Sequence, residues 1–290
     1  MRVFITGAGG QLGRELVSQF ERHDHHDVIA ATHEHLELSA RDAVLGLITA
    51  TRPDAIVHAA AWTAVDACEG EPDRAFAVNM LGVRHVAEAA RRVEAPVFYI
   101  STDYVFDGSK DEPYVEWDDP APASVYGRSK LAGERELDPG STIIRTSWVC
   151  GYHGGNMVKT ILRLAGEHDE LSFVDDQRGH PTFAEDLAVA IKQLVVERRP
   201  GLFHVTNQGA VSWYEFAREV LRLSGQDPDR VRPVSTADLQ LPRPAPRPAN
   251  SVLDNAALRN SGLPLPPDFR EPLERLIGRL ASDSAAATGA

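Results

Sequence analysis

A glycine-rich turn close to the N-terminus constrains the fold of this chain more than any other feature. Residues 3–6 form a short apolar run typical of a strand, residues 11–21 have helical spacing, and Gly-Ala-Gly-Gly-Gln-Leu-Gly at 7–13 joins them. Gly7, Gly10 and Gly13 permit a tight turn, a close approach of a pyrophosphate, and close contact between helix and strand. The helix N-terminus also offers free N–H groups to phosphates. The turn therefore predicts a dinucleotide site.

The first half of the chain continues this alternation of strand and helix. Segments of this length in this order predict βαβ units and a parallel sheet with right-handed crossovers. We therefore expect an α/β fold with a Rossmann-like, doubly wound parallel sheet. The elements expected after the first helix are a strand at 28–31, a helix at 43–50, a strand at 55–58, a helix at 73–93, a strand at 97–101, a helix at 125–137 and a strand at 141–146.

The pattern loosens after Trp148, which indicates a smaller C-terminal α/β domain for the substrate. We expect the NAD(P)-binding domain to comprise 1–146 and about 183–205, and the substrate-binding domain to comprise about 147–182 and 206–281. A disordered tail is expected at 282–290 because its residues are small and polar. The expected elements are helices at 157–165, 183–196 and 213–223, strands at 171–174 and 202–204, and a Pro-rich stretch at 241–248 that cannot form a helix.

Composition excludes several classes of function. The chain has 290 residues with 30 Lys and Arg against 42 Asp and Glu, a formal charge of −12, which argues against binding to nucleic acid or to an anionic membrane. Cys68 and Cys150 lie far apart and are expected to be free thiols in a reducing compartment. No run has the length of a membrane helix and the first residues do not resemble a signal peptide, so we expect a cytoplasmic protein. The His-rich segment at 23–27 is expected to be a solvated loop, and no metal site is predicted.

The end of the second strand bears on the choice of cofactor. An acidic residue there would bind the ribose 2′-hydroxyl of NAD. The strand instead ends Ala-Ala-Thr-His at 30–33, with Glu34 just beyond, and Arg14 lies in the nearby helix. These residues favour NADPH, with NADH tolerated.

A tyrosine and a lysine four residues apart begin the helix expected at 125–137. Tyr126 and Lys130 share one helix face, so the ammonium lies beside the phenol, which lowers the pKa of the tyrosine and makes it a usable proton donor. Upstream, the strand at 97–101 runs into Thr102 and Asp103. Ligands of open parallel sheets bind beyond the carboxyl ends of the strands, so these two side chains should face the cofactor cleft.

Taken together, these motifs resemble the extended short-chain dehydrogenase/reductases, and among them the dTDP-4-dehydrorhamnose reductase family. The resemblance spans about residues 1–280. The Arg-Thr-Ser-Trp and Asp-Asp-Gln runs at 145–148 and 175–177 are specific to this subgroup. The matching segments are 7–13, 58–66, 78–79, 101–108, 126–134, 145–151, 174–182 and 247–251.

The resemblance implies NADPH-dependent reduction of the C4 ketone of a dTDP-4-dehydro-6-deoxysugar, with dTDP-4-dehydrorhamnose first among the candidates. Tyr126 would be the proton donor, Lys130 would tune it and hold the nicotinamide ribose, and Thr102 would bind the reacting oxygen. The substrate would contact Thr102, Asp103, Trp148 and Arg247. The remaining cofactor contacts implied are Gln11, Leu12, Glu37, Leu38, Ala61, Trp62, Thr63 and Asn79.

Alternatives within the resemblance stay open. One is reduction of another dTDP-4-keto-6-deoxyhexose in secondary metabolism, and another is a non-catalytic, dinucleotide-binding regulatory subunit. A 4,6-dehydratase is disfavoured, because Tyr104 stands where that chemistry needs a glutamate. Some relatives form homodimers bridged by magnesium; Glu15 and Glu185 match two of the bridging carboxylates, but Arg270 stands in the third position.

Overall fold

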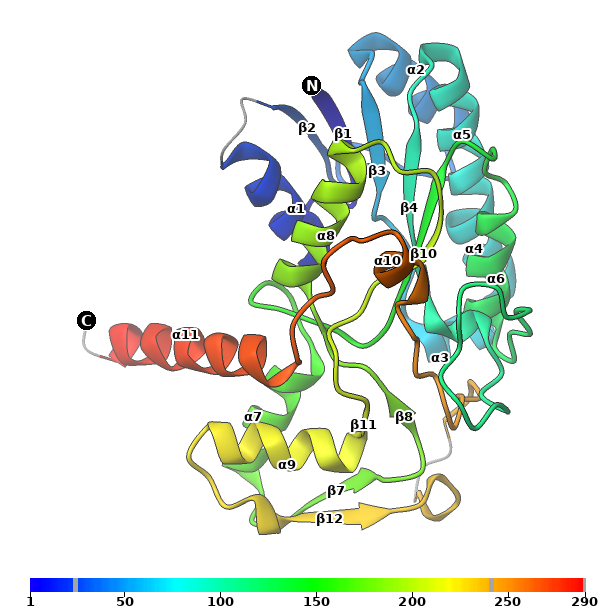
Figure 1. The fold of residues 1–290 in the computed structure, drawn as a ribbon. Coiled ribbons are helices and arrows are strands. Elements are labelled where there is room, and N and C mark those ends of the chain that lie inside the picture. Colours follow the sequence, from blue (N-terminus) through cyan, green and yellow to red (C-terminus); the bar gives the residue numbers. More distant parts are fainter. Residues whose placement is uncertain (23–25, 240–242, 289–290) are drawn as a thin grey trace.

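A six-stranded, fully parallel sheet forms the larger part of the molecule (Figure 1). The computed structural model describes residues 1–22, 26–239 and 243–288. The strand order is β10-β5-β4-β3-β1-β2, so the order reverses between β1 and β3, where a dinucleotide binds in folds of this kind. The strands are β1 (Arg2–Thr6), β2 (Asp27–Ala31), β3 (Ala55–His58), β4 (Val97–Thr102), β5 (Thr142–Thr146) and β10 (Gly201–His204). The predicted Rossmann-like α/β fold is confirmed.

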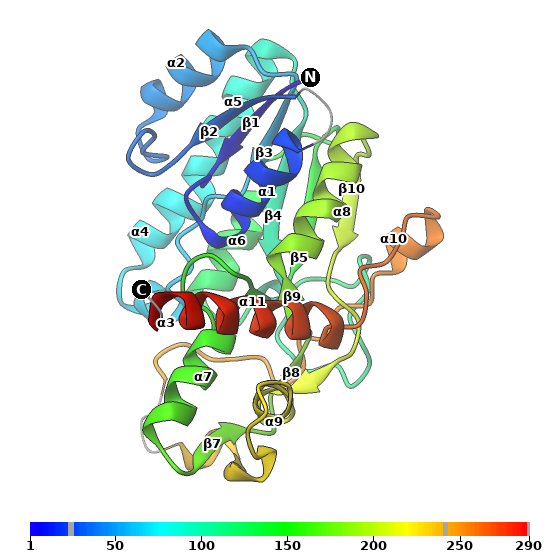
Figure 2. The same ribbon diagram turned by 90° about the vertical axis from the view of Figure 1, so that its left-hand side faces the viewer.

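Helices cover both faces of this sheet (Figure 2). α1 (Gln11–Glu21) and α8 (Ala184–Val196) pack side by side on one face, around Phe20, Leu187 and Ile191. The other face carries α2 (Arg41–Thr51), α3 (Val65–Gly70), α4 (Pro72–Phe76), the π-helical turn η1 (Ala77–Leu81), α5 (Gly82–Val93) and α6 (Val125–Glu134). Because both faces are covered, the strands are almost continuously apolar, as buried parallel strands are.

A smaller part with its own apolar core lies beyond the carboxyl ends of the strands (Figure 1). Its two longer strands pair in parallel, and α7 and α9 pack against each other around Phe216 and Val220. The helices are α7 (Met157–Glu167), α9 (Trp213–Leu223) and α11 (Arg270–Thr288). The strands pair as β6 (Val149–Cys150) with β9 (Thr182–Phe183), β7 (Leu171–Val174) with β12 (Val231–Val234), and β8 (Arg178–Gly179) with β11 (Val211–Ser212). Short 3₁₀ turns are η2 (Asp103–Val105), η3 (Pro228–Arg230) and η4 (Thr236–Asp238).

The chain returns to the larger part twice after leaving it. α8 packs on α1, and β10 pairs with β5 at the edge of the sheet. α10 (Ala256–Asn260) then packs on β10, and Leu258 and Leu263 join the core beside α8. The second return differs from the sequence prediction, which placed all of 206–281 in the smaller domain. α10 has only five residues, so its sequence shows no apolar repeat that would indicate which core it joins.

Two other predictions about helices are corrected. The helix expected at 73–93 is one run, but it widens into the π turn η1 at Ala77–Leu81. The tail expected to be disordered from 282 is helical to Thr288, because its alanine-rich sequence continues α11, and alanine has the highest helix propensity. Residues 23–25 and 241–242, which belong to the predicted His-rich loop and Pro-rich stretch, lie outside the described residues.

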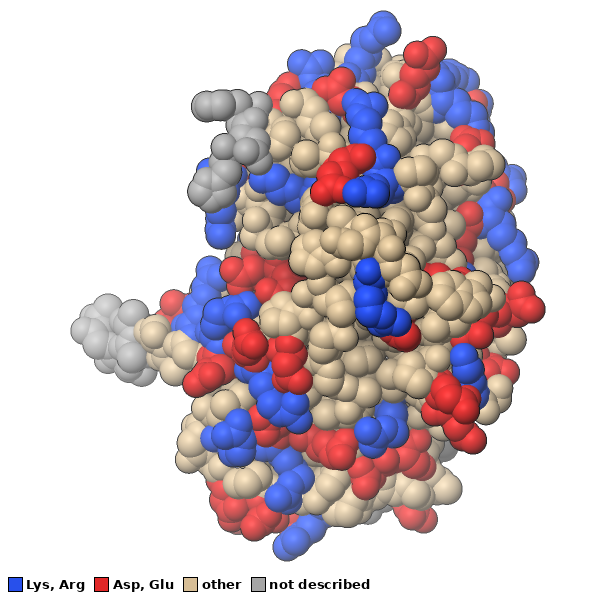
Figure 3. Space-filling view, in the orientation of Figure 1, with Lys and Arg blue, Asp and Glu red and all other residues tan. Residues whose placement is uncertain are grey.

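On the face drawn in Figure 3, acidic and basic side chains lie interspersed around a largely uncharged middle. Among the described residues, no helix has both the length and the apolar character needed to cross a membrane.

Candidate active site

Two neighbouring cavities run along the carboxyl ends of the parallel strands. The first, of about 810 Å³, lies beside β1, β2 and β3, and the second, of about 490 Å³, lies beside β1, β4 and β5. Gly7, Gly10, Ala59 and Ala61 line both, so the two form one continuous groove with the glycine turn between them. We call them the adenosine-side cavity and the catalytic cavity.

The glycine turn is shaped by close contacts that only glycine permits. Gly7 has φ +67°, and a Cβ there would lie 2.8 Å from the Cα of Ala60; a Cβ on Gly13 would lie 2.1 Å from the carbonyl oxygen of Gly7. Gly10 is the N-cap of α1, and no side chain among the described residues caps this end. The first N–H groups of α1 therefore face the groove without an intrahelical acceptor, which suits the pyrophosphate of a dinucleotide.

Gln11 uses its side chain to join the two parts of the molecule. Its Nε2 donates to the carbonyl oxygen of Val149 at 2.8 Å, and its Oε1 accepts from Asn156 Nδ2 at 2.8 Å. Gln11 and Leu12 line the catalytic cavity beside the glycines. Any contact of Gln11 with a pyrophosphate therefore falls to its backbone N–H.

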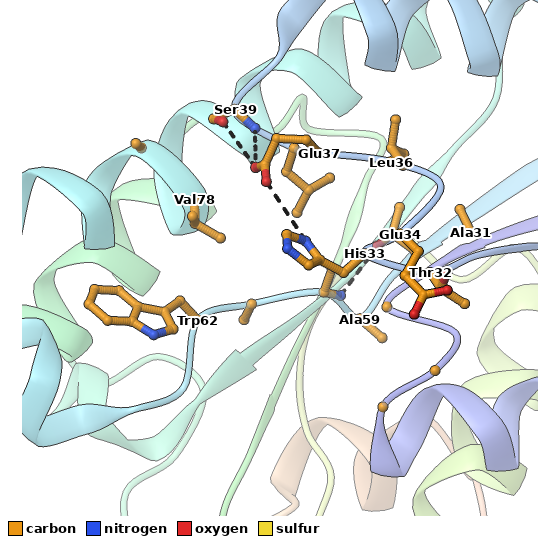
Figure 4. Close-up of a pocket in the computed structure, with 18 of the residues that line it drawn as sticks. Ala31, Thr32, His33, Glu34, Leu36, Glu37, Ser39, Ala59, Trp62 and Val78 are labelled. Carbon is orange, nitrogen blue, oxygen red and sulfur yellow. Dashed lines mark hydrogen bonds and ion pairs between the residues drawn. The ribbon is translucent and has the colours of Figure 1, made fainter.

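Exposed charged side chains surround the adenosine-side cavity (Figure 4). Glu37 accepts hydrogen bonds from the backbone N–H and the hydroxyl of Ser39. These bonds lower the pKa of Glu37, and the backbone bond has the larger effect. The guanidinium of Arg74 lies 4.5 Å from the ring centroid of Trp62. Arg14 donates from Nε to the carbonyl oxygen of Gly9 at 3.1 Å and also lines the cavity, as do Leu38, Ala61 and Trp62.

Asn79 lies behind the cavity wall rather than in it. This buried side chain accepts from the backbone N–H of Trp62 at 2.8 Å and donates to the carbonyl oxygen of Trp62 at 3.0 Å and to Ser129 Oγ at 3.1 Å. It lines neither cavity, although the sequence predicted it as a cofactor contact. Its amide is fully used in holding the 61–63 loop against α6, so it acts on the groove through Trp62.

Tyr126 reaches the catalytic cavity because α6 approaches the end of β4 unusually closely. Ser124 caps α6, accepting from the N–H of Gly127, and a Cβ on Gly127 would lie 2.1 Å from the carbonyl oxygen of Tyr104. This approach brings Tyr126 to Thr102, and both line the catalytic cavity. Burial raises the pKa of Tyr126 above its ordinary value, and a hydrogen bond with Thr102 acts in the opposite direction.

The predicted lowering of the Tyr126 pKa by Lys130 is therefore wrong. Loss of hydration disfavours the phenolate more strongly than the neighbouring groups favour it. Tyr126 is consequently protonated at neutral pH, which is the state that a proton donor needs.

Lys130 lies one turn beyond Tyr126, at the wall of the same cavity. Its Nζ donates to the carbonyl oxygen of Ile100 at 2.7 Å and lies 4.1 Å from the ring centroid of Tyr99. Burial lowers the pKa of Lys130 to about 7, while the carboxylate of Glu134 acts to raise it. Near neutral pH, then, Lys130 exchanges between its charged and neutral forms.

Asp103 and two stacked tryptophans extend the catalytic cavity away from the glycine turn. Burial raises the pKa of Asp103 to about 6. Trp148 has a φ of +43° and stacks on Trp213. The ring centroids are 3.5 Å apart, and the angle between the ring planes is 8°. Both rings line the cavity. Trp213 begins α9, and the pairing of β8 with β11 carries it to Trp148, so it packs against the core of the smaller part and also lines the cavity.

Arg247 lies next to this cavity in a bidentate ion pair. Its two terminal nitrogens bind the carboxylate of Asp66 at 2.6 and 2.7 Å. The pair joins α3 to the Pro-rich segment, and the hydrogen bond from Arg247 lowers the pKa of Asp66. The predicted substrate contact thus has a carboxylate partner in this structure, and it does not itself line either cavity.

The residues considered for a bridging metal have other neighbours. Glu15 lies 3.7 Å from Nε2 of His153, and Arg270 pairs with Asp268 and Glu219. No cluster of three or more candidate ligands occurs in residues 1–22, 26–239 and 243–288.

Comparison with known proteins matches residues 1–282 to the family described as the RmlD substrate binding domain. A dTDP-4-dehydrorhamnose reductase from Sinorhizobium fredii is 43% identical, and the alignment covers 97% of this chain and 98% of that one. The chain belongs to the dTDP-4-dehydrorhamnose reductase family. A second relative, from Streptomyces antibioticus, is named a probable dTDP-4,6-dihydroxy-2-methyloxan-3-one 4-ketoreductase and is 41% identical over 94% of this chain and 93% of its own.

Solved structures of the same family superpose closely on this chain. The dTDP-4-dehydrorhamnose reductase of Clostridium acetobutylicum has a TM-score of 0.93 at 41% identity, covering 97% of this chain and 100% of its own. The Bacillus anthracis reductase, solved in complex with NADP, has a TM-score of 0.91 at 40% identity, covering 96% and 99%. The similarity extends over both parts of the molecule, including the substrate-side half.

Proposed function

We propose that this member of the dTDP-4-dehydrorhamnose reductase family reduces the C4 ketone of a dTDP-4-dehydro-6-deoxysugar with NADPH, and that dTDP-4-dehydrorhamnose is its substrate. The observation that carries the proposal is the meeting of Thr102, Tyr126 and Lys130 in one cavity that continues into the glycine turn. A dinucleotide on the turn extends from one cavity into the other. The same arrangement disfavours a purely regulatory role, since regulation needs no proton donor.

The residues of this chain supply the proton and hold the reacting groups. The reduced nicotinamide, when bound, supplies the hydride that C4 gains. The Thr102 hydroxyl, which donates to Asp103 Oδ1 at 3.0 Å in this structure, turns its hydrogen to the ketone oxygen. Tyr126 transfers its hydroxyl proton to that oxygen, so the ketone becomes a hydroxyl group. The ammonium of Lys130 stabilises the phenolate left on Tyr126. Solvent then returns the proton to Tyr126.

The aromatic surface of the catalytic cavity supports a sugar-nucleotide substrate. Trp148 presents a ring already fixed by Trp213, so little conformational freedom is lost when a sugar or base packs on it. Asp103 lies beside Thr102, where it accepts hydrogen bonds from sugar hydroxyls. Arg247, which we assign to the diphosphate, exchanges its bond with Asp66 for one with the substrate.

The preference for NADPH rests on Arg14. Its guanidinium is tied to the turn only through the carbonyl oxygen of Gly9, and it pairs with no acidic side chain of the described residues. Glu34 also lines the cavity and has the opposite effect on a 2′-phosphate, which is why we expect NADH to be tolerated. The binding of NADP by the Bacillus anthracis relative agrees with this choice.

The proposal is tested by following NADPH oxidation with dTDP-4-dehydrorhamnose, with product stereochemistry determined. A panel of other dTDP-4-keto-6-deoxyhexoses tests the second candidate, which the similarity to the Streptomyces antibioticus ketoreductase favours. Turnover of dTDP-4-dehydrorhamnose with the highest kcat/KM is expected. Higher kcat/KM for another keto sugar reassigns the substrate, and no turnover of any of them refutes the reductase assignment.

We also propose a cytoplasmic location and a homodimer for this chain. Cys68 and Cys150 are buried free thiols, as expected in a reducing compartment. The homodimer is checked by sedimentation, with and without magnesium, because Arg270 in place of a carboxylate argues against a metal bridge.

A further inference from the structure

A buried carboxylate lies directly behind the catalytic residues, one helical turn beyond Lys130. Glu134 binds Arg145 through both oxygens, at 2.9 and 2.7 Å, and it accepts from Ser101 Oγ at 2.5 Å. The Arg145 and Glu134 side chains are only 4% and 5% exposed. Burial of a charged pair carries a desolvation cost that packed apolar side chains in the same place would not carry.

The partners of Glu134 are themselves neighbours in the sheet. Ser101 of β4 stands opposite Arg145 of β5, and the next pair in this register is Thr102 opposite Thr146. Both threonines line the catalytic cavity. Glu134 therefore connects α6, which carries Tyr126 and Lys130, to the two strand ends that carry the rest of the wall.

We propose that Glu134 is a positioning residue for the reaction: it fixes α6 against the Ser101–Arg145 pair and places a carboxylate four residues beyond Lys130 on the same helix face, where it attracts the ammonium group. The effect of Glu134 on catalysis rests on the proposed function. Lys130 has no carboxylate hydrogen bond of its own, since its Nζ donates to the carbonyl oxygen of Ile100. The electrostatic attraction of Glu134 is the effect that opposes loss of its proton.

Among the described residues, Glu134 is the charged group that acts on the pKa of Lys130, and burial is the other influence. The other titratable groups near Lys130 and Glu134 are His58 on β3, Tyr99 on β4, Arg145 on β5 and Tyr126 on α6, and Asp103 on η2 acts on Tyr126. On the helices packed against α6, Glu69 accepts from the N–H of Val125, Arg74 pairs with Glu71, and Arg84 pairs with Glu136.

The test compares Glu134→Gln with Glu136→Gln. Glu136 is a matched control because it also forms a bidentate pair with an arginine on another element, at 2.8 and 2.8 Å, but that pair is exposed and outside the cavity. Only four residues of the chain are lysines, at 110, 130, 159 and 192, and Lys130 alone is buried. Carbon-13-labelled lysine therefore gives a resolvable NMR titration, with Lys130 assigned by its absence from Lys130→Met.

Glu134→Gln is expected to move the Lys130 titration about one pH unit lower, while Glu136→Gln leaves it at the wild-type position. Glu134→Asp, which keeps the charge, should restore the wild-type titration. A Lys130 titration unchanged in Glu134→Gln overturns the proposal, as does a Glu134→Asp titration that matches Glu134→Gln.

A second variant removes the risk that Glu134→Gln does not fold because it leaves Arg145 without its partner. Glu134→Gln/Arg145→Met removes both charges, so the Lys130 titration is expected to lie below the wild-type position, by less than in Glu134→Gln because the positive charge of Arg145 is lost as well. A titration at or above the wild-type position overturns the proposal. In turnover, kcat should fall about tenfold or more in these variants, because α6 loses its register. The NMR titration needs no substrate. Failure of the wild type to reduce any keto sugar would therefore refute the proposed function, while the Lys130 titration would still test the role of Glu134.

Discussion

The two cavities of the groove are built in contrasting ways. The catalytic cavity is held by two polar bonds behind its wall, from Lys130 to the Ile100 carbonyl and from Arg145 to Glu134. The adenosine-side cavity is bordered by exposed side chains, among them Arg14 and Glu34. A hydrogen bond shielded from water fixes the positions of its donor and acceptor, whereas the interactions of exposed charges are screened by water. The groove is therefore rigid where chemistry takes place and tolerant where the cofactor's phosphate is recognised.

The strongest test of this contrast is Tyr126→Phe, which removes one oxygen from the rigid cavity. We expect kcat to fall by about 10²–10⁴-fold, since the proton donor is lost, with little change in KM. Steady-state kinetics with the keto sugar measure this. Tyr214→Phe, on α9 outside the groove, should retain wild-type kcat, and equal activity of the two variants would contradict the assignment.

The glycine turn, shared by both cavities, is probed by Gly7→Ala. The new Cβ would lie 2.8 Å from the backbone of Ala60 at a φ of +67°, so the turn must shift. Strain of this kind costs about 1–3 kcal/mol, and we expect NADPH affinity, measured by fluorescence titration, to fall more than about tenfold. The matched control is Gly46→Ala in α2, where nothing lies within 4 Å of the added Cβ. That substitution should raise the melting temperature slightly and leave affinity unchanged.

The pH dependence distinguishes the catalytic cavity from the exposed one. The pKa of Lys130 lies near 7, below its ordinary value, so the ammonium form is present below pH 7 and is lost as pH rises. For a group with this pKa, the charged fraction falls about fivefold between pH 7 and pH 8, and kcat/KM should follow it. A kcat/KM profile that stays flat to pH 9 would contradict this expectation, because it would show that Lys130 keeps its proton before the keto sugar binds.

The smallest effect is expected at the adenosine side. Arg14→Gln should raise KM for NADPH about threefold and leave KM for NADH unchanged, because an exposed charge contributes little. Arg22→Gln, at the far end of α1, is the control. An equal change in KM for NADPH and NADH would mean that Arg14 stabilises the glycine turn and does not bind the 2′-phosphate.

Patterns within short segments were sufficient to predict the parallel sheet, the glycine turn and the Tyr126–Lys130 pair. Their spacing follows from local geometry: the strand–turn–helix sequence sets the turn, and the helical repeat places residues 126 and 130 on one face. The segment 213–223 was likewise predicted with the bounds of α9. Such features depend on residues that are close in the chain, so they can be inferred without a structure.

Contacts between distant segments settle the remaining features of the groove. Trp213 stacks on Trp148 across 65 positions of sequence, Asn79 turns from the cavity to Trp62, and burial reverses the expected direction of the Tyr126 pKa shift. Each depends on which surfaces exclude water and which strands become neighbours. Glu134 is the clearest case: its place in α6 is evident from the sequence, but its partners are assembled only when β4 and β5 pair. Desolvation and strand register are properties of the folded chain, and no local pattern encodes them.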